Sequence, residues 1–382
     1  MKKVLFSISI VSLMMLILAY TVACGTEKAS YNIDEKGQTV PDGDEDINQS
    51  SELVEENVQD NNTTEDKSEF DLLYNPPESG SPENIGKILF CSEPEDTEEN
   101  GDYYLYTINP DGTNMTKMPF FGNWMWHPVW SPEYSRIAYS ANLGDTEKIF
   151  IMTAEGSQNK QLTFGEGRDK FPTWSPDGKL IAYISYIDSI PNLFVIDIYG
   201  NNQKQLTFVE GKDTVVWPSY SPVEDAIAYT YNSSEEGIGA RIIVIRSDGT
   251  EIVKLPAPED PDSHFSHPGW STDGRILYFL SNQSRHVEVW KIDYYKLIHN
   301  LTAEEDDKYD DLGLIQLTDL YGSGVAADYR PRVSPDGNKI VFCGGCAEEQ
   351  VSGFNLITIN IDGSDITNIT DFTIDACEWP DW

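Results

Sequence analysis

Short runs of apolar residues, each bounded by Gly, Pro, Asp or Ser, recur along this chain from about residue 86 onward. Runs of this length that are rich in Ile, Val, Tyr and Phe favour β-strands over helices. One set of runs (RIAYSA, LIAYIS, AIAYTY, ILYFLS and KIVFCG) occupies 136–141, 180–185, 226–231, 276–281 and 339–344. Further runs follow, at 148–156, 192–200, 241–249 and 355–363, and end in Gly-bearing turns. The pattern predicts an all-β protein.

A Pro-x-aromatic element, usually followed by Ser-Pro-Asp-Gly or a close relative, precedes each pair of runs. Its prolines are separated by 44, 46, 50, 63 and 49 residues and are Pro128, Pro172, Pro218, Pro268, Pro331 and Pro380. Ser-Pro-Asp-Gly is turn chemistry, because Pro presets φ, Asp bonds to nearby backbone and Gly accepts a positive φ. A short run such as KQLTF closes each unit, so each unit is predicted to be a four-stranded antiparallel sheet.

A single sheet of this kind cannot bury both of its apolar faces, whereas radial stacking of several sheets buries them all. The region opens at 86–92 with a second strand that lacks a first, and it ends at 377–382 with a first strand that lacks the rest. Residues 86–382 are therefore predicted to form a six-bladed β-propeller of four-stranded antiparallel blades. It closes by pairing the C-terminal strand with the N-terminal three. We expect the repeated Trp to pack between blades and the polar insertion at 296–313 to form a loop.

The pattern Pro-x-Trp-Ser-Pro-Asp-Gly followed by Ile-Ala-Tyr resembles the repeat of the TolB-type β-propeller family across residues 86–382. The resemblance implies the fold more strongly than the function, because relatives include periplasmic TolB, the propellers of prolyl oligopeptidases and some oligogalacturonate lyases. The chain departs from these relatives in two ways. A tether replaces the α/β domain that precedes the propeller in TolB, and the sequence holds no Gly-x-Ser-x-Gly elbow of the hydrolases.

Residues 1–23 are typical of a secretory signal peptide, with two lysines followed by an apolar run. Thr21-Val22-Ala23-Cys24 resembles a bacterial lipobox, although Thr21 stands where Leu is usual, and the resemblance implies lipidation of Cys24. An uncleaved transmembrane anchor is the alternative. Residues 24–85 are predicted to be a disordered acidic tether, since 25–85 hold 17 Asp and Glu against 3 Lys. Either way, the remainder is expected outside the cytoplasm.

The formal net charge of −38 argues against binding nucleic acid or anionic lipid, and a cation or a basic partner would be attracted. Loops that precede the repeat prolines are expected to meet at one mouth of the channel. The candidate binding residues there are Asp169, Asp213, Asp262, Asp328, Asp375, His127, His267 and Arg330. The carboxylates would hold Ca²⁺ or a basic peptide, and the histidines would allow another metal. Solvated turn residues are the alternative.

Four cysteines besides Cys24 make an even number, which favours disulfides in an exported chain. Cys91, Cys343, Cys346 and Cys377 allow three pairings. A bridge between Cys91 and Cys377 would join the two strands of the shared blade, and Cys343 would then close locally onto Cys346. A redox role for this Cys-Gly-Gly-Cys is disfavoured, because no helix N-terminus is expected beside it.

The sequence predicts a monomeric lipoprotein whose propeller is a non-catalytic platform for an envelope protein or peptide, with no cofactor other than a Ca²⁺ at the mouth. The alternative is a propeller that binds or, with a metal, degrades polysaccharide. That alternative would use the aromatic stretch at 120–128, in which Trp124 and Trp126 would stack on sugar rings.

Replacing the proposed lipidation site tests the anchor. We expect Cys24→Ala to abolish lipid attachment, shift mobility in gel electrophoresis and release the protein from membranes, because the thiol that accepts the lipid is lost. Membrane attachment that is unchanged in the variant would contradict lipidation.

Overall fold

The computed structural model describes residues 84–93, 103–119, 121, 123–142, 144, 146–234, 239–256, 258, 262–300, 313–320, 325–346, 354–370 and 377–382. The predicted signal peptide, Cys24 and all of the tether up to residue 83 lie outside these residues. No helix within the described ranges is long and apolar enough to cross a membrane.

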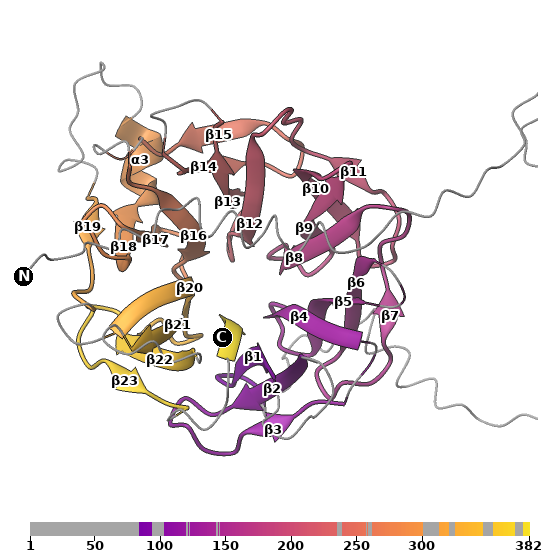
Figure 1. The fold of residues 1–382 in the computed structure, drawn as a ribbon, viewed down its shortest axis with the longest axis horizontal. Helices are drawn as coiled ribbons and strands as arrows, with labels where there is room; N and C mark the ends of the chain where they lie inside the picture. The colour runs from indigo at the N-terminus through magenta and orange to yellow at the C-terminus, as the bar shows by residue number, and fades with distance from the viewer. Residues whose placement is uncertain are drawn as a thin grey trace, which may run out of the picture. The chain divides into compact units, whose positions relative to one another are not determined.

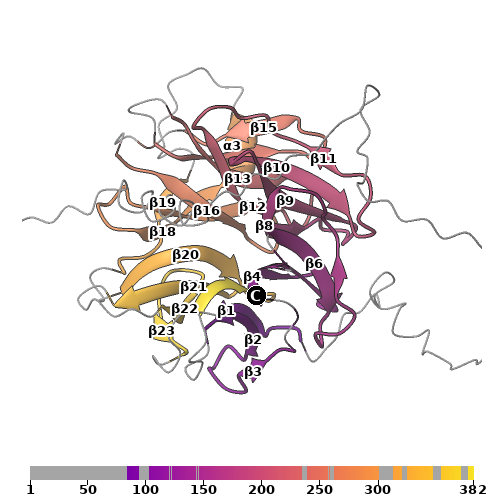
Figure 2. The same ribbon diagram turned by 45° about the vertical axis from the view of Figure 1, so that its right-hand side comes forward.

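The described strands form six four-stranded antiparallel sheets arranged around a central axis, as Figures 1 and 2 show. The first blade contains β24 (Cys377–Asp381), β1 (Ile88–Ser92), β2 (Tyr104–Ile108) and β3 (Thr116–Lys117). The second contains β4 (Asn123–Trp130), β5 (Arg136–Asn142), β6 (Glu147–Thr153) and β7 (Lys160–Gln161). The third contains β8 (Arg168–Trp174), β9 (Leu180–Ile187), β10 (Ile190–Asp197) and β11 (Lys204–Gln205).

The remaining three blades follow in chain order. In each of them the strand with the lowest number lies nearest the central axis. The fourth contains β12 (Thr214–Tyr220), β13 (Ile227–Asn232), β14 (Arg241–Ile245) and β15 (Glu251–Lys254). The fifth contains β16 (Phe265–Trp270), β17 (Ile276–Ser281), β18 (Glu288–Asp293) and β19 (Ile315–Gln316). The sixth contains β20 (Val325–Val333), β21 (Lys339–Cys346), β22 (Asn355–Asn360) and β23 (Thr367–Asn368).

The two ends of the folded region meet in the first blade. Strand β24 pairs antiparallel with β1, with Leu89 opposite Asp381 and Ser92 opposite Cys377. Figure 1 shows the yellow C-terminal strand beside the indigo β1. The predicted six-bladed propeller and its closure by the C-terminal strand are therefore confirmed.

Each central strand is buried on both faces, which explains its nearly continuous apolar sequence. In β5, Ile137 and Tyr139 pack in a cluster that includes Leu89 of the first blade. The intervening Ala138 packs on the other face with Ile181 of the third blade. Successive side chains of a strand point to opposite faces, so each blade supplies half of two neighbouring interfaces.

The repeated tryptophans join adjacent blades, as predicted. The indole Nε1 of Trp174 donates to the carbonyl oxygen of Val129 at 3.4 Å, and that of Trp270 donates to Ser219 at 3.0 Å. Trp130 bonds Lys87 in the same way at 3.2 Å. A buried Trp therefore satisfies its N–H while its ring fills the interface between two blades.

The Ser-Pro-Asp-Gly turns form through the bonds their residue types allow. In the third blade, Asp177 accepts hydrogen bonds from the Ser175 hydroxyl at 2.7 Å and the Lys179 amide at 3.1 Å. The Ser175 hydroxyl oxygen also accepts from the Leu180 amide at 2.9 Å. Gly178 takes a φ of 66°, where a side chain would be strained.

The insertion after Trp270 differs from the expected loop. Its first residues belong to α3 (Tyr294–Asn300), which begins just before the insertion and in which Tyr294 and Leu297 are buried. The rings of Tyr294 and Trp270 meet edge to face at 4.8 Å. Two apolar residues three positions apart lie on one face of a helical turn, a spacing hidden by the acidic composition of the segment. Residues 301–312 lie outside the described ranges.

Truncation of an inter-blade tryptophan should destabilise the propeller. Trp174→Ala should lower the free energy of unfolding by about 3–5 kcal/mol, because a buried ring is removed. Trp174→Phe keeps most of the packing and should lose about 1 kcal/mol with the hydrogen bond. Urea unfolding measures both.

The matched control is Phe208→Ala, because Phe208 is 76% exposed and its removal should change the unfolding free energy by less than about 0.5 kcal/mol. Equal losses in Trp174→Ala and Phe208→Ala would contradict the role of Trp174 between the blades.

Candidate functional site

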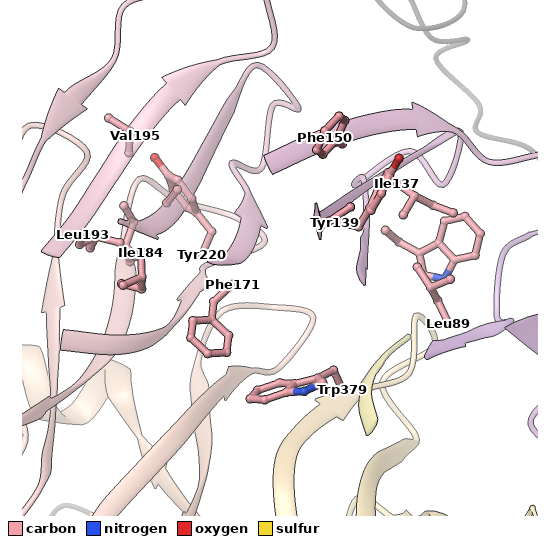
Figure 3. Packing of buried hydrophobic residues seen from close by; sticks show 14 of the residues in the cluster. Leu89, Ile137, Tyr139, Phe150, Phe171, Ile184, Leu193, Val195, Tyr220 and Trp379 are labelled. Carbon is pink, nitrogen blue, oxygen red and sulfur yellow. The ribbon is translucent and has the colours of Figure 1, made fainter. Parts of the chain in front are cut away.

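The residue directly before each repeat proline lies at the central channel. The six are His127, Phe171, Trp217, His267, Arg330 and Trp379, one from each blade. Ring centroids from different blades lie 4.2 Å apart for His127 and Phe171, 5.1 Å for Phe171 and Trp379, and 3.7 Å for Trp217 and His267. Figure 3 shows Phe171 and Trp379 facing one another. We call these six residues the channel plug.

The backbone of the innermost strands bends to place the plug. The register between inner and second strands skips at this point, for example between Lys170 and Thr173 in β8. Five plug residues adopt a φ between 52° and 56°, a region that costs an L side chain about 1–2 kcal/mol. Glycine would relieve that strain but would supply no ring. The strain is thus retained at positions where the side chain fills the channel.

Arg330 supplies the charge of the plug. Its guanidinium donates to the carbonyl oxygens of Pro128 at 2.9 Å and Pro380 at 3.3 Å, and it lies 6.0 Å from the Trp379 ring. The side chain is buried, and burial lowers the pKa of Arg330 from its ordinary value. Arg330 therefore ties the sixth blade to the second across the channel.

Both candidate histidines lie in the channel plug with Arg330. His127 Nδ1 lies 2.6 Å from the Ser140 hydroxyl, and His267 Nδ1 lies 3.2 Å from the Ser266 hydroxyl. Burial lowers the pKa of both histidines well below the ordinary value, and Arg330 acts in the same direction. No three His, Cys, Asp or Glu side chains of the described residues converge as metal ligands.

A second charged group lies beside the plug, formed by Arg332 and Asp381. Arg332 Nε is 3.2 Å from Asp381 Oδ1, and the other oxygen accepts from the Trp130 amide at 2.8 Å. Burial raises the pKa of Asp381 against the opposing effect of both arginines. Burial, with Arg330 adding to it and Asp381 opposing it, lowers the pKa of Arg332 to about 9.

The sequence carries a signal for this pair, although neither residue is among the predicted candidates. Arg332 and Asp381 occupy the same repeat position, the x of Pro-x-aromatic, in neighbouring blades. Close approach also requires Gly269 at this position of the fifth blade, because a Cβ there would lie 2.3 Å from the Pro331 carbonyl oxygen.

The Arg332–Asp381 pair borders a cavity of about 180 Å³ where the innermost strands end. We call it the channel mouth. Hydroxyl groups and turn prolines contribute to the lining, and its aromatic residues are Trp130, Tyr134, Trp174, Tyr220, Trp270 and Trp382. The sequence placed the candidate site at the other end, where the innermost strands begin. Residues of the repeat turns therefore line the channel mouth, in addition to their role in forming the blades.

Two of the five predicted aspartates have protein partners of their own in the described structure. Asp169 is buried in an ion pair with Lys148 at 3.2 Å, and Asp213 accepts from the Tyr231 hydroxyl at 2.5 Å and the Ser234 amide at 2.8 Å. Asp262 is exposed. Asp328 lies in β20, where its side chain is outside the description, as is all of Asp375. Asp169 and Asp213 close loops of equal length, yet their partners differ, because Lys148 comes from the neighbouring blade and Tyr231 from the same blade.

The predicted bridge between Cys91 and Cys377 is not formed, and both residues are free thiols. Cys91 lies opposite Glu378, and Cys377 lies opposite Ser92, so their side chains point to different faces of the sheet. They accordingly pack in different inter-blade clusters. Cys343 is buried in the cluster of Cys377, and the side chain of Cys346 is outside the description.

The aromatic stretch of the second blade is packed rather than presented as open rings. Trp126 lies 5.4 Å from Tyr103 and 5.4 Å from Trp124, and the Lys170 ammonium lies 5.7 Å from its ring. Both tryptophans are half-buried. The faces needed for stacking on sugars are therefore largely engaged.

The fold and channel define a six-bladed β-propeller built on a Pro-x-Trp-Ser-Pro-Asp-Gly repeat. The chain belongs to the TolB beta propeller domain family, whose sequence profile matches residues 84–309. No curated protein matches the sequence.

Two solved structures illustrate the likeness. TolB from Acinetobacter baumannii is 18% identical with a TM-score of 0.60, over 82% of this chain and 70% of that one. Hydrazine synthase from Kuenenia stuttgartiensis is 12% identical with a TM-score of 0.55, over 78% and 46%. Identities this low establish the fold alone.

Acid should weaken the propeller through the plug histidines. As pH falls below about 6.5, histidines of the unfolded chain bind protons while the buried ones stay neutral. The free energy of unfolding should therefore fall by up to about 1.4 kcal/mol per pH unit for each histidine. His267→Asn removes one of these groups and tolerates the positive φ.

Urea unfolding of the native chain and of His267→Asn between about pH 7.5 and 5.5 measures this slope. The difference in unfolding free energy at about pH 7.5 gives the effect of the substitution apart from protonation. The variant should show the smaller loss of stability on acidification. Identical slopes would contradict the assignment.

Proposed function

We propose that this protein is an extracytoplasmic, lipid-anchored β-propeller that binds a protein segment at the channel mouth and catalyses no reaction. The observation that carries the proposal is the composition of that mouth. Aromatic edges, prolines and hydroxyl groups from several blades surround one charged pair, and Arg332 and Asp381 already bond one another. Such a lining suits recognition, and committed charges are poor candidates for proton transfer.

The size of the mouth favours a peptide segment over a drug-sized ligand. A cavity of about 180 Å³ lies below the range usual for small-molecule sites, which starts at about 300 Å³. It suits a side chain inserted from a protruding segment. Membership of the TolB beta propeller domain family supports a protein-binding role at the envelope.

The acidic charge of the chain favours a basic partner. A net charge of −38 raises the association rate with positively charged proteins and opposes self-association, which fits a monomeric platform. The acidic tether would hold the propeller away from the anchored end at Cys24.

Filling the mouth tests the proposal. Thr272 lines the cavity and is exposed, so Thr272→Trp should occupy the mouth without disturbing the core. The full chain would be mildly crosslinked in native membranes, and its companions would be quantified by mass spectrometry. We expect a companion of the native protein to fall about tenfold or more in Thr272→Trp.

Glu155→Trp is the matched control, because Glu155 is an exposed turn residue outside the cavity lining. A companion retained equally by native protein and both variants would refute binding at the mouth. Absence of any protein companion would refute the platform and direct attention to glycans.

A further inference from the structure

The second and third blades carry nearly the same loop on the face opposite the channel mouth. The loops read Leu-Thr-Phe-Gly-Glu-Gly-Arg-Asp at 162–169 and Leu-Thr-Phe-Val-Glu-Gly-Lys-Asp at 206–213. The first loop leads into β8, which ends at Trp174 beside the mouth, so loop and mouth lie at opposite ends of the innermost strand. The corresponding loops of the later blades lack this pattern.

Each loop is held rigidly at both of its ends. The Thr163 hydroxyl accepts from the Ile149 amide at 3.0 Å, and the Thr207 hydroxyl accepts from Leu193 at 2.8 Å. At the other end, Asp169 pairs with buried Lys148, whose ammonium also bonds the Gly167 carbonyl. Asp213 is anchored by Tyr231 and Ser234, as described above. The aspartates of the motif are therefore anchors.

The phenylalanine of each loop is turned to solvent by these anchors. Phe164 is 69% exposed and Phe208 is 76% exposed, and Ile187 at the β9–β10 turn is 49% exposed. Rings this exposed contribute little to the core, whereas an exposed apolar group on a rigid loop loses little entropy on binding.

A cavity lies beside the second loop. It measures about 210 Å³ and lies at the end of the third blade, with Ile187, Ile190 and Val209 among its lining residues. Val209 directly follows Phe208, and its amide donates to Asn192 Oδ1 at 2.9 Å. A Cβ at Gly167 of the other loop would lie 3.4 Å from Ile187, so this loop lies against the same residue. The hollow has a mixed lining, because Ser185, Asp188, Asn192 and Gln205 accompany the apolar residues. The second loop borders it directly, and the first loop reaches it through Ile187.

We propose that Phe164, Phe208 and the Ile187 hollow form a second docking surface for an extended segment of a partner protein. That segment carries apolar side chains and at least one Lys or Arg. The acidic complement comes from Asp188, which lines the hollow, and from exposed Glu166 and Glu210, one in each loop. Arg168 of the first loop is already paired with Glu147, which leaves Lys212 as the opposing cation of the two loops. The charge of −38 opposes docking of a second copy or of an anionic membrane. This surface is separate from the channel mouth, so either assignment can fail alone.

A random-peptide phage library selected on the immobilised full chain tests the surface. Enriched sequences should combine aromatic or aliphatic residues with Lys or Arg. A synthetic peptide of the enriched sequence should bind the double variant Phe164→Ser/Phe208→Ser about tenfold or more weakly than the native chain. Raising NaCl from about 0.05 M to about 0.3 M should also weaken binding of the peptide to the native chain, because salt screens the attraction between opposite charges.

Tyr199→Ser is the matched control, since Tyr199 is an exposed aromatic of the same blade, in the turn after β10 at its other end. It should bind like the native chain, and all variants should keep the native melting temperature. Peptides that bind Thr272→Trp more weakly than the native chain use the channel mouth, and they are left out of the comparison.

Four results would overturn the proposal. The first is failure to enrich any peptide, and the second is equal affinity of the native chain and the double variant for the synthetic peptide. The third is a dimer in sedimentation that the double variant abolishes. The fourth is binding to phosphatidylcholine vesicles that depends on Phe164 and Phe208. The last two would assign the surface to a second copy or to a lipid surface.

Discussion

Burial of every blade on both faces is the constraint on which the whole structure depends. Alternate residues of β5 pack toward the first and third blades, so no blade is stable without two neighbours. A ring is the arrangement that gives each blade two neighbours, and pairing of β24 with β1 closes it. The Trp indoles reinforce each interface by donating to a neighbouring carbonyl, as Trp174 does to Val129.

Closure of the ring creates a central axis that the innermost strands must fill. The chain does so with the residue before each repeat proline, placed at positive φ by a skip in the register. The rings of His127, Phe171 and Trp379 meet there, and Arg330 bonds carbonyl groups from two other blades. The plug therefore fills the channel between the two faces of the propeller, and each face presents a separate surface.

The two faces use the repeat differently. On one, the ends of the innermost strands surround the Arg332–Asp381 pair, and the repeat turns make the mouth. On the other, two strand-leading loops are each held by an aspartate and turn a phenylalanine outward. The acidic charge spread over the chain favours basic partners at both.

Spacing in the sequence determined the blade number, the strand order and the closure, because turn residues and two-faced apolar strands act locally and repeat in every unit. The shared repeat position of His127 and His267 also indicated that both lie on an innermost strand. Only the tertiary structure decided what the loop aspartates do, because the partners of Asp169 and Asp213 come from other strands at distances the spacing does not encode. It also decided that Cys91 and Cys377 face apart, since one step of register reverses the direction of a side chain.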